Sequence, residues 1–380
     1  MSPLTYYIIF YSLFIGLLLA AKLYRQSERI CQILVWVLLT LFSGLRVGPG
    51  RDYLVYLNAY TDPMSSSAQY LEFSWGFINH ICRNLLGMPL HFWLMWIAGL
   101  TYALMLYGFR RWRIDWVWGI LTYVLIYKGF FESLNTIRQC LAVSIVFAGS
   151  ASLVVDRKPI RFVGSVLLAS LFHSSAILSL ALYLLVYRKY SRWLLLLALG
   201  VSFVTGLTLF PMLLDAFGSF IPQRYALYLS SDETATQTIS GLYKIFLNLF
   251  ASFLAIRSGW GGELDKRATF GVQAIALSVC MYNILSTFEP GLRLMLYPYA
   301  MIFICFPLLL KHNRGIWRIG TATFLLGFSL LTFKEISNPE EPYAHYQTVY
   351  DLTTPTNHMQ KIEDRKEWTR SQGAQGRYDL

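Results

Sequence analysis

The sequence predicts an all-α integral membrane protein that crosses the bilayer many times, and three observations lead to this prediction. Apolar residues make up 56% of the 380-residue chain, charged residues only 14%, and the mean hydropathy is +0.46. The apolar residues gather in runs of about 16 to 22 residues, close to the length that a helix needs to cross the hydrocarbon core. Basic residues gather between these runs, as in polytopic proteins. An ordinary soluble domain is therefore excluded.

Ten of the apolar runs are expected to be full spans. They cover residues 5–21, 30–45, 89–107, 114–131, 136–155, 193–210, 241–256, 268–288, 293–310 and 316–333. The first run has no basic region before it and no small-residue cleavage pattern, so we expect it to be retained as a span. Residues 1–333 then form a single transmembrane domain that carries the chemistry, and residues 334–380 form a polar C-terminal tail.

Six basic clusters decide the predicted topology. They are Lys22/Arg25/Arg29, Arg110/Arg111/Arg113, Arg157/Lys158/Arg161, Arg188/Lys189/Arg192, Arg257/Lys266/Arg267 and Lys311/Arg314/Arg318. All six can lie in the cytoplasm only if residues 161–187, too long for one span, enter the membrane and return. We therefore expect a broken or re-entrant helix pair whose turn, His173-Ser174-Ser175, lies towards the outer side, where irregular backbone is buried or lines a wet cavity.

Familiar motifs for other chemistry are absent from the sequence. There is no Walker loop, no nucleotide-binding glycine pattern, no zinc-protease motif and no calcium-binding loop. The five cysteines suggest neither a disulfide framework nor a metal cluster, so we expect no metal and no cofactor. The net charge of +11 is attributed to cytoplasmic loops and anionic lipid, and no nucleic-acid partner is expected.

Two outer loops, residues 46–88 and 211–240, carry many polar residues outside the spans. In the first loop, Tyr53, Tyr56 and Tyr60 recur at helical spacing after a Gly-Pro-Gly turn. Residues 69–86 predict an amphipathic helix in the membrane interface, with Glu72 on its polar stripe. Glu72 is either a catalytic group or a solvated residue of a packing element. The second loop, which contains Arg224, suits an acceptor-binding loop or a plain connector.

Arg138 lies near the predicted outer end of an apolar span, with Asn135 and Gln139 on the same helical face. Charged side chains inside spans are rare and often mark a ligand pathway. An arginine in the first turn of a helix also makes an anion site, because the free N–H groups and the helix dipole favour negative charge there. Snorkelling to a headgroup, or structural pairing with Glu132, is the alternative.

Arg293 repeats this pattern at the start of another span, after Glu289-Pro290. With Arg46 and Arg51 in the first outer loop, up to four guanidinium groups could converge on a ligand with several negative oxygens. A pyrophosphate at the outer face of the bilayer is the natural candidate.

If a group is transferred from such a pyrophosphate to a hydroxyl, as in glycosyl transfer, the reaction needs a residue that accepts the proton of that hydroxyl. Asp52, Glu72 and His173 are the candidates by residue type. A histidine in a broken membrane hairpin can also be purely structural, so the assignment of His173 stays open.

In chain order, these motifs resemble those of the EpsG/Wzy-like bacterial polysaccharide polymerases. The residues that carry the resemblance are Gly50-Arg51-Asp52-Tyr53 with Tyr56, Glu72 with Gly76-Phe77, Asn135-x-x-Arg138-Gln139 with Ala142, Phe172-His173-Ser174-Ser175-Ala176, Arg293 with Tyr297, and Pro342-Tyr343. The resemblance implies a metal-independent glycosyltransferase of the broad GT-C type in the bacterial inner membrane, with its active site facing the periplasm or the outside. It would join oligosaccharide repeat units, and both the donor and the acceptor would be linked to undecaprenyl pyrophosphate. Membrane lipid is a further expected partner. A chain-length regulator is a candidate protein partner.

The resemblance also implies roles for the site residues. Arg138 and Arg293 would grip the pyrophosphate, Asp52 or Glu72 would orient or deprotonate the acceptor, and His173 would complete the site. Further substrate-binding residues are expected at Arg46, Arg51, Tyr53, Tyr56, Asn135, Gln139 and Arg224.

Two other functions stay open. An O-antigen ligase would use the same donor with a different acceptor, and would be expected to carry one large ordered outer domain. A flippase or transporter of the lipid-linked oligosaccharide would be expected to show internal repeats with paired broken helices, whereas this sequence has one broken hairpin.

Overall fold

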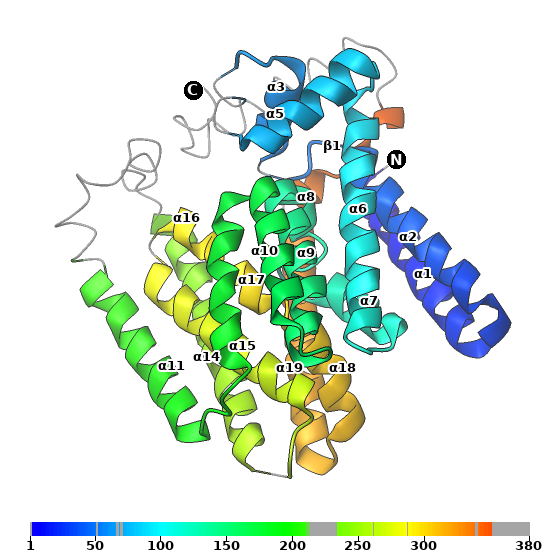
Figure 1. Ribbon diagram of the computed structural model, residues 1–380. Coiled ribbons are helices and arrows are strands. Elements are labelled where there is room, and N and C mark those ends of the chain that lie inside the picture. The colour runs from blue at the N-terminus through cyan, green and yellow to red at the C-terminus, as the bar shows by residue number, and fades with distance from the viewer. Residues whose placement is uncertain are drawn as a thin grey trace.

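The computed structural model describes residues 2–50, 52–65, 68, 71–210, 212, 234–260, 262–286, 288–338 and 341–351. These residues form a bundle of helices, and the short elements β1 (Arg46–Val47), α3 (Tyr53–Thr61) and α5 (Phe73–His80) lie together at one end of it (Figure 1). The first part of the chain contains α1 (Pro3–Leu23), η1 (Arg25–Ser27), α2 (Glu28–Gly44), β1 (Arg46–Val47), α3 (Tyr53–Thr61), α5 (Phe73–His80), η2 (Ile81–Leu85), α6 (Leu90–Arg111), α7 (Trp116–Leu125), α8 (Glu132–Asn135), α9 (Ile137–Val154) and α10 (Pro159–Phe172). The second part contains η3 (Ser174–Leu185), α11 (Arg192–Leu207), α14 (Thr234–Gly259), α15 (Lys266–Leu285), α16 (Glu289–Leu292), η5 (Arg293–Met295), α17 (Leu296–Tyr299), α18 (Ile302–His312), α19 (Gly315–Ser337), η6 (Pro342–His345), β2 (Gln347–Thr348) and η7 (Val349–Asp351).

The predicted class, an all-α polytopic membrane protein, is confirmed. Within the described residues, seven helical segments are long and apolar enough to cross a membrane. They are Pro3–Leu23, Arg25–Gly44, Leu90–Arg111, Ile137–Val154, Lys266–Leu285, Arg293–His312 and Gly315–Ser337. The other three expected spans correspond to the 10-residue helix α7, the 16-residue helix α11 and the 26-residue helix α14. The count of ten full crossings stays a prediction.

The expected span at residues 114–131 is a shorter helix followed by a turn. Helix α7 ends at Leu125, and Lys128 then adopts a positive φ of 64°. A Cβ at Gly129 would lie 2.2 Å from the carbonyl oxygen of Tyr123, so only glycine fits this close approach. The next residue, Phe130, is fully buried and anchors the turn among the aromatic rings of α1, α2 and α6. This turn separates α7 from the short helix α8, which precedes α9.

The expected break in residues 161–187 is present at His173. Helix α10 ends at Phe172, His173 has extended backbone angles (φ −153°, ψ 110°), and the 3-10 helix η3 begins at Ser174. The 14 residues of α10 rise about 21 Å, while the 12 residues of η3, with the larger rise of a 3-10 helix, span about 24 Å. The two arms are therefore of similar length and pack against each other.

The six basic clusters lie together at one end of the bundle, opposite the break at His173. Contacts that join neighbouring clusters are Lys22 with Asp115, Arg111 with Asp156, Arg267 with the carbonyl groups of Trp112 and Arg113, Arg192 with the ring of Trp260, and Arg257 with Asn313. The loop that contains β1, α3 and α5 lies at the other end, beside the tip of the α10–η3 pair (Figure 1). The in-and-out path of residues 161–187 is what brings all six clusters to one side.

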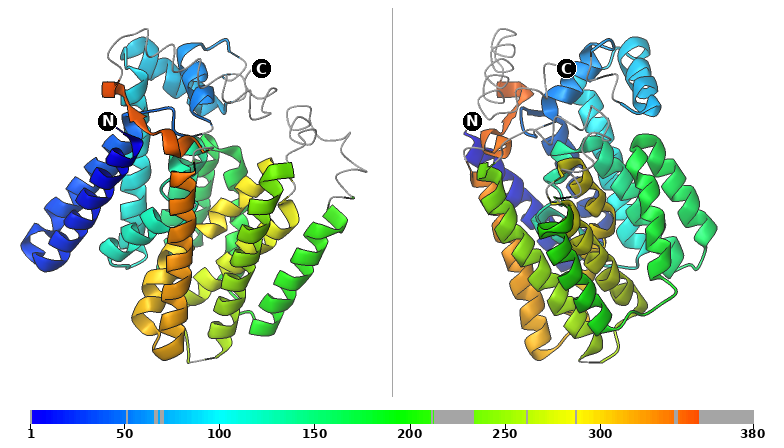
Figure 2. Two further views of the ribbon diagram at one scale, coloured as in Figure 1. Left: turned by 180° about the vertical axis from the view of Figure 1, so that it is seen from behind. Right: turned by 90° about the vertical axis from the view of Figure 1, so that its left-hand side faces the viewer.

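Residues after α19 return to the end that carries β1. Strand β2 pairs antiparallel with β1, and the Val349 amide donates to the Leu45 carbonyl at 2.9 Å. The hydroxyl groups of Tyr343 and Tyr346 donate to the carbonyl groups of Phe131 and Phe42 at 3.0 and 2.5 Å. The N-terminus lies at this same end (Figure 2). The described part of the tail therefore packs on the bundle and braces the segment between α2 and α3.

Candidate functional site

The predicted site residues that the structure describes meet at the end of the bundle opposite the basic clusters. They come from four separate parts of the chain: the loop between α2 and α6, the break between α8 and α9, the break between α10 and η3, and the start of η5. Among them are two contacts between an arginine and a carboxylate, which make the core of the site. Arg51 and Arg224, also predicted, lie outside the described residues.

The first contact joins Arg138 to Glu72. Arg138 Nη1 donates to Glu72 Oε2, while His173 Nδ1 lies 3.1 Å from Glu72 Oε1 and the Ser174 amide donates to the same oxygen at 3.2 Å. The side chains of Arg138, Glu72 and His173 are only 16 to 17% exposed. Glu72 thus connects the start of α9 to the tip of the broken helix pair.

The surroundings of Glu72 hold it in the ionised form. Burial raises the pKa of this carboxyl group, but the hydrogen bond with His173 and the charge of Arg138 outweigh burial and lower the pKa to about 2. Trp75, one turn further along α5, fixes the backbone here, because its indole N–H donates to the Phe172 carbonyl at 2.6 Å. Glu72 is therefore a firmly held anion and a weak proton acceptor.

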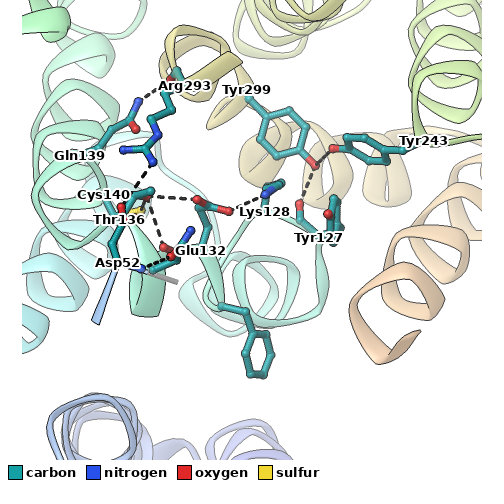
Figure 3. Close-up of polar contacts among 12 residues, drawn as sticks. Asp52, Tyr127, Lys128, Glu132, Thr136, Gln139, Cys140, Tyr243, Arg293 and Tyr299 are labelled. Carbon is teal, nitrogen blue, oxygen red and sulfur yellow. Dashed lines mark hydrogen bonds and ion pairs between the residues drawn. The ribbon is translucent and has the colours of Figure 1, made fainter. Parts of the chain in front are cut away.

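The second contact joins Arg293 to Asp52 and is looser. Arg293 Nη2 lies 3.5 Å from Asp52 Oδ2, and the two side chains are 29% and 20% exposed. Asn135 accepts a hydrogen bond from the Asp52 amide at 3.0 Å, and the Gln139 amide group donates to the Arg293 carbonyl (Figure 3). Asn135 and Gln139 thus hold the backbones of the two partners from the α8–α9 break.

Arg46 is buried beneath the site, with 1% of its surface exposed. Its guanidinium donates to the carbonyl oxygens of Ser43, Pro49 (3.3 Å) and Leu134 (2.9 Å). Gly50 follows with a φ of 100°, and a Cβ there would lie 2.5 Å from the Leu134 carbonyl oxygen. These contacts make Arg46 a residue that positions the loop against α8, whereas the sequence had predicted direct substrate binding.

The two predicted tyrosines, Tyr53 and Tyr56, lie on α3, and their side chains are buried. Tyr53 and Tyr56 are 4% and 5% exposed. Burial raises the pKa of Tyr56 to about 12, in spite of the nearby positive charges of Arg138 and Arg293. Tyr56 is therefore a neutral hydroxyl next to both arginines, able to donate a hydrogen bond to an anion that they bind.

Lys128 was not predicted as a site residue, and Glu132 was expected only as a possible partner of Arg138. Lys128 Nζ in fact binds Glu132 Oε2 at 2.8 Å, directly beside the Asp52–Arg293 contact (Figure 3). The i, i+4 spacing of the two residues was the available signal.

Within the described residues, no group of three or more His, Cys, Asp or Glu side chains could hold a metal ion.

This site can exchange one anion for another. Arg138 and Arg293 each contact a carboxylate oxygen, and a guanidinium can bind phosphate oxygens in place of carboxylate oxygens. The looser contact, between Arg293 and Asp52, is the easier one to replace.

The fold and the site define a polytopic membrane protein that gathers paired arginines and carboxylates at one end of its helix bundle. The chain matches the model of the EpsG family over residues 29–348, and it therefore belongs to this family of Wzy/EpsG-like polysaccharide polymerases. No curated protein and no solved structure matches the chain.

Proposed function

We propose that the protein is a glycosyltransferase that polymerises oligosaccharide repeat units linked to undecaprenyl pyrophosphate. The reaction takes place at the periplasmic or outer face of the bacterial inner membrane, and the lipid pyrophosphate is the leaving group. The observation that carries the proposal is the pair of arginine–carboxylate contacts, Arg138–Glu72 and Arg293–Asp52, at the end of the bundle away from all six basic clusters.

Arg138 and Arg293 bind the pyrophosphate oxygens of the donor. Negative charge grows on these oxygens as the bond between the sugar C1 and the phosphate oxygen breaks, so both arginines stabilise the transition state. The neutral hydroxyl of Tyr56 supports them as a hydrogen-bond donor.

Asp52 is the proton acceptor in this scheme. When a phosphate oxygen of the donor binds Arg293, it takes the place of Asp52, which lies 3.5 Å from this arginine. The Asp52 carboxylate is then free to bind the acceptor hydroxyl. The hydroxyl oxygen then attacks C1 and its proton passes to Asp52, while the bonding electrons of the broken C1–O bond leave with the lipid pyrophosphate. Glu72 keeps its contacts with Arg138 and His173 and positions that arginine, because its pKa of about 2 makes it a weak base.

The test uses the purified protein in detergent with a radiolabelled lipid-linked repeat unit. Wild-type protein should produce a ladder of polymer bands and release one lipid pyrophosphate for each unit added. Arg293→Gln should remove at least about 99% of this activity, because it deletes a charge-assisted contact that strengthens in the transition state. Full ladder formation by Arg293→Gln and by Arg138→Gln would overturn the assignment of the pyrophosphate site.

A further inference from the structure

An ion pair with a buried carboxylate and a partly exposed lysine lies near Arg293. Glu132, whose side chain is 8% exposed, receives Lys128 Nζ on Oε2 at 2.8 Å and the Thr136 hydroxyl on Oε1 at 3.2 Å. In Figure 3 the Glu132 carboxylate lies between Lys128 and the Arg293–Asp52 contact. The negative member of the pair therefore faces the Arg293–Asp52 contact, and Lys128 lies on its other side (Figure 3).

The electrostatics agree with this geometry. Burial raises the pKa of Glu132, but the positive charge of Lys128, followed by that of Arg293, holds it below the ordinary value. A charge in a poorly solvated site acts on its neighbours over several ångströms, because little water is present to screen it. The negative end of the pair thus offsets part of the positive potential that Arg293 offers to a ligand.

A polymerase must release its lipid pyrophosphate after every addition. Asp52 and Glu72 already lie beside the two arginines, and a further negative charge near Arg293 lowers the affinity for this product and speeds the next cycle. Lys128 and Thr136 already bind the two oxygens of Glu132, so this carboxylate can weaken the anion site without leaving its partners.

We propose that the Lys128–Glu132 pair sets how tightly the Arg293 side of the site holds pyrophosphate: Glu132 weakens the binding, and Lys128 limits that weakening. This inference rests on the function proposed above. Both residues are positioning residues in the electrostatic sense, because they act through Arg293.

The alternative role is purely structural, because the pair also lies in the turn that leads from α7 to α9. The two roles predict different signs. If the pair only holds the turn, substitution of either residue should damage the site in the same direction, and reversing the pair should restore it. If its charge matters, the two substitutions should shift pyrophosphate affinity in opposite directions.

The experiment measures inhibition of chain elongation by inorganic pyrophosphate in the full-length protein. Glu132→Gln should lower the inhibition constant about tenfold and slow turnover, and Lys128→Met should raise the constant about tenfold. The reversed pair, Lys128→Glu with Glu132→Lys, keeps an ion pair and a hydrogen bond to Thr136 but presents a positive charge towards Arg293. Its inhibition constant should fall at least as far as that of Glu132→Gln.

The matched control is the Lys22–Asp115 ion pair at the opposite end of the bundle. Lys22→Gln and Asp115→Asn should leave the inhibition constant unchanged. Thermal melting in detergent identifies any variant that fails to fold. If a single variant fails to fold, the inhibition constant of the reversed pair distinguishes the electrostatic role from the structural one.

The outcomes separate this inference from the proposed function. If wild-type elongation is not inhibited by pyrophosphate, or if Arg293→Lys leaves the inhibition constant unchanged, the pyrophosphate site itself is wrong. If pyrophosphate inhibits through Arg293 but the reversed pair behaves like the wild type, or Glu132→Gln and Lys128→Met shift the constant in the same direction, only the role of the Lys128–Glu132 pair is wrong.

Discussion

Arg138→Lys keeps the positive charge at the start of α9 but removes the planar fork of the guanidinium. Arg138 uses Nη1 to bind Glu72, and its Nε is buried without a hydrogen-bond partner among the described residues. An arginine can hold Glu72 with one nitrogen and a phosphate oxygen with another. A lysine has a single nitrogen on a flexible stem and must divide it between the two anions.

The expected loss follows from the missing contact. One hydrogen bond to a charged group contributes about 1.5 to 3 kcal/mol. If the lysine keeps its contact with Glu72 and loses one phosphate contact in the transition state, kcat/KM for the lipid-linked donor should fall by about 10- to 150-fold. The buried position, with the Arg138 side chain 16% exposed, argues against rescue by solvent.

The assay is the initial rate of ladder formation at several donor concentrations, with protein folding checked by thermal melting in detergent. Arg83→Lys is the matched control, since Arg83 lies at the same end of the bundle but donates to the carbonyl groups of Tyr60 and Thr61 at 3.1 and 2.8 Å. It should change the rate by less than about threefold. A rate within about threefold of wild type for Arg138→Lys would refute the idea that Arg138 binds Glu72 and a phosphate oxygen at the same time.

Three further predictions follow from the site. Asp52→Asn should lower kcat by about 10²- to 10⁴-fold with little change in donor KM, whereas Glu72→Gln should mainly raise donor KM. The reverse pattern would show that Glu72 is the base. Because the pKa of Glu72 is about 2 in the folded protein and ordinarily 4.5, its contacts stabilise the fold fully above about pH 4.5 and are lost as the pH falls towards 2. The melting temperature of Glu72→Gln should therefore depend less on pH between about 5 and 3 than that of the wild type, and equal slopes would contradict the ion pair. Arg46→Met should destabilise the protein by about 3 kcal/mol or more, because it leaves three buried carbonyl groups without their donor. The melting temperature should fall, and an unchanged melting temperature would show that the loop does not depend on Arg46.

The path of the chain could be predicted because it depends on local composition. The basic clusters and the overlong run at residues 161–187 are visible in the sequence, and together they allow one topology. The turn after α7 could not be predicted in this way, because residues 114–131 read as one apolar run. Its position is decided by packing, through the close approach of Gly129 to the Tyr123 carbonyl and the burial of Phe130.

The residue types of the site could be predicted, but their partners could not. The sequence offers Glu132, six residues before Arg138, as the partner of this arginine, whereas its partner in the structure is Glu72, 66 residues away. His173 reaches the same carboxylate from 101 residues away. Such contacts depend on how α5 packs on the tip of the α10–η3 pair, and no local pattern encodes that.

The buried arginine Arg46 illustrates the same limit. Its neighbours in sequence, a Gly-Pro-Gly turn and a second arginine, resemble an exposed binding loop. Arg46 lies opposite Thr348, 302 residues further along, in the pairing of β1 with β2. This pairing and the contact with Leu134 enclose the Arg46 side chain.

The most direct test of the central claim is reconstitution of the purified protein in liposomes with repeat units linked to undecaprenyl pyrophosphate. If the protein is a polymerase, we expect a polymer ladder, release of one lipid pyrophosphate for each unit added, and loss of both when Asp52 is replaced by asparagine or Arg293 by glutamine. Movement of the lipid-linked units between leaflets without any elongation would rule out the polymerase and identify a transporter.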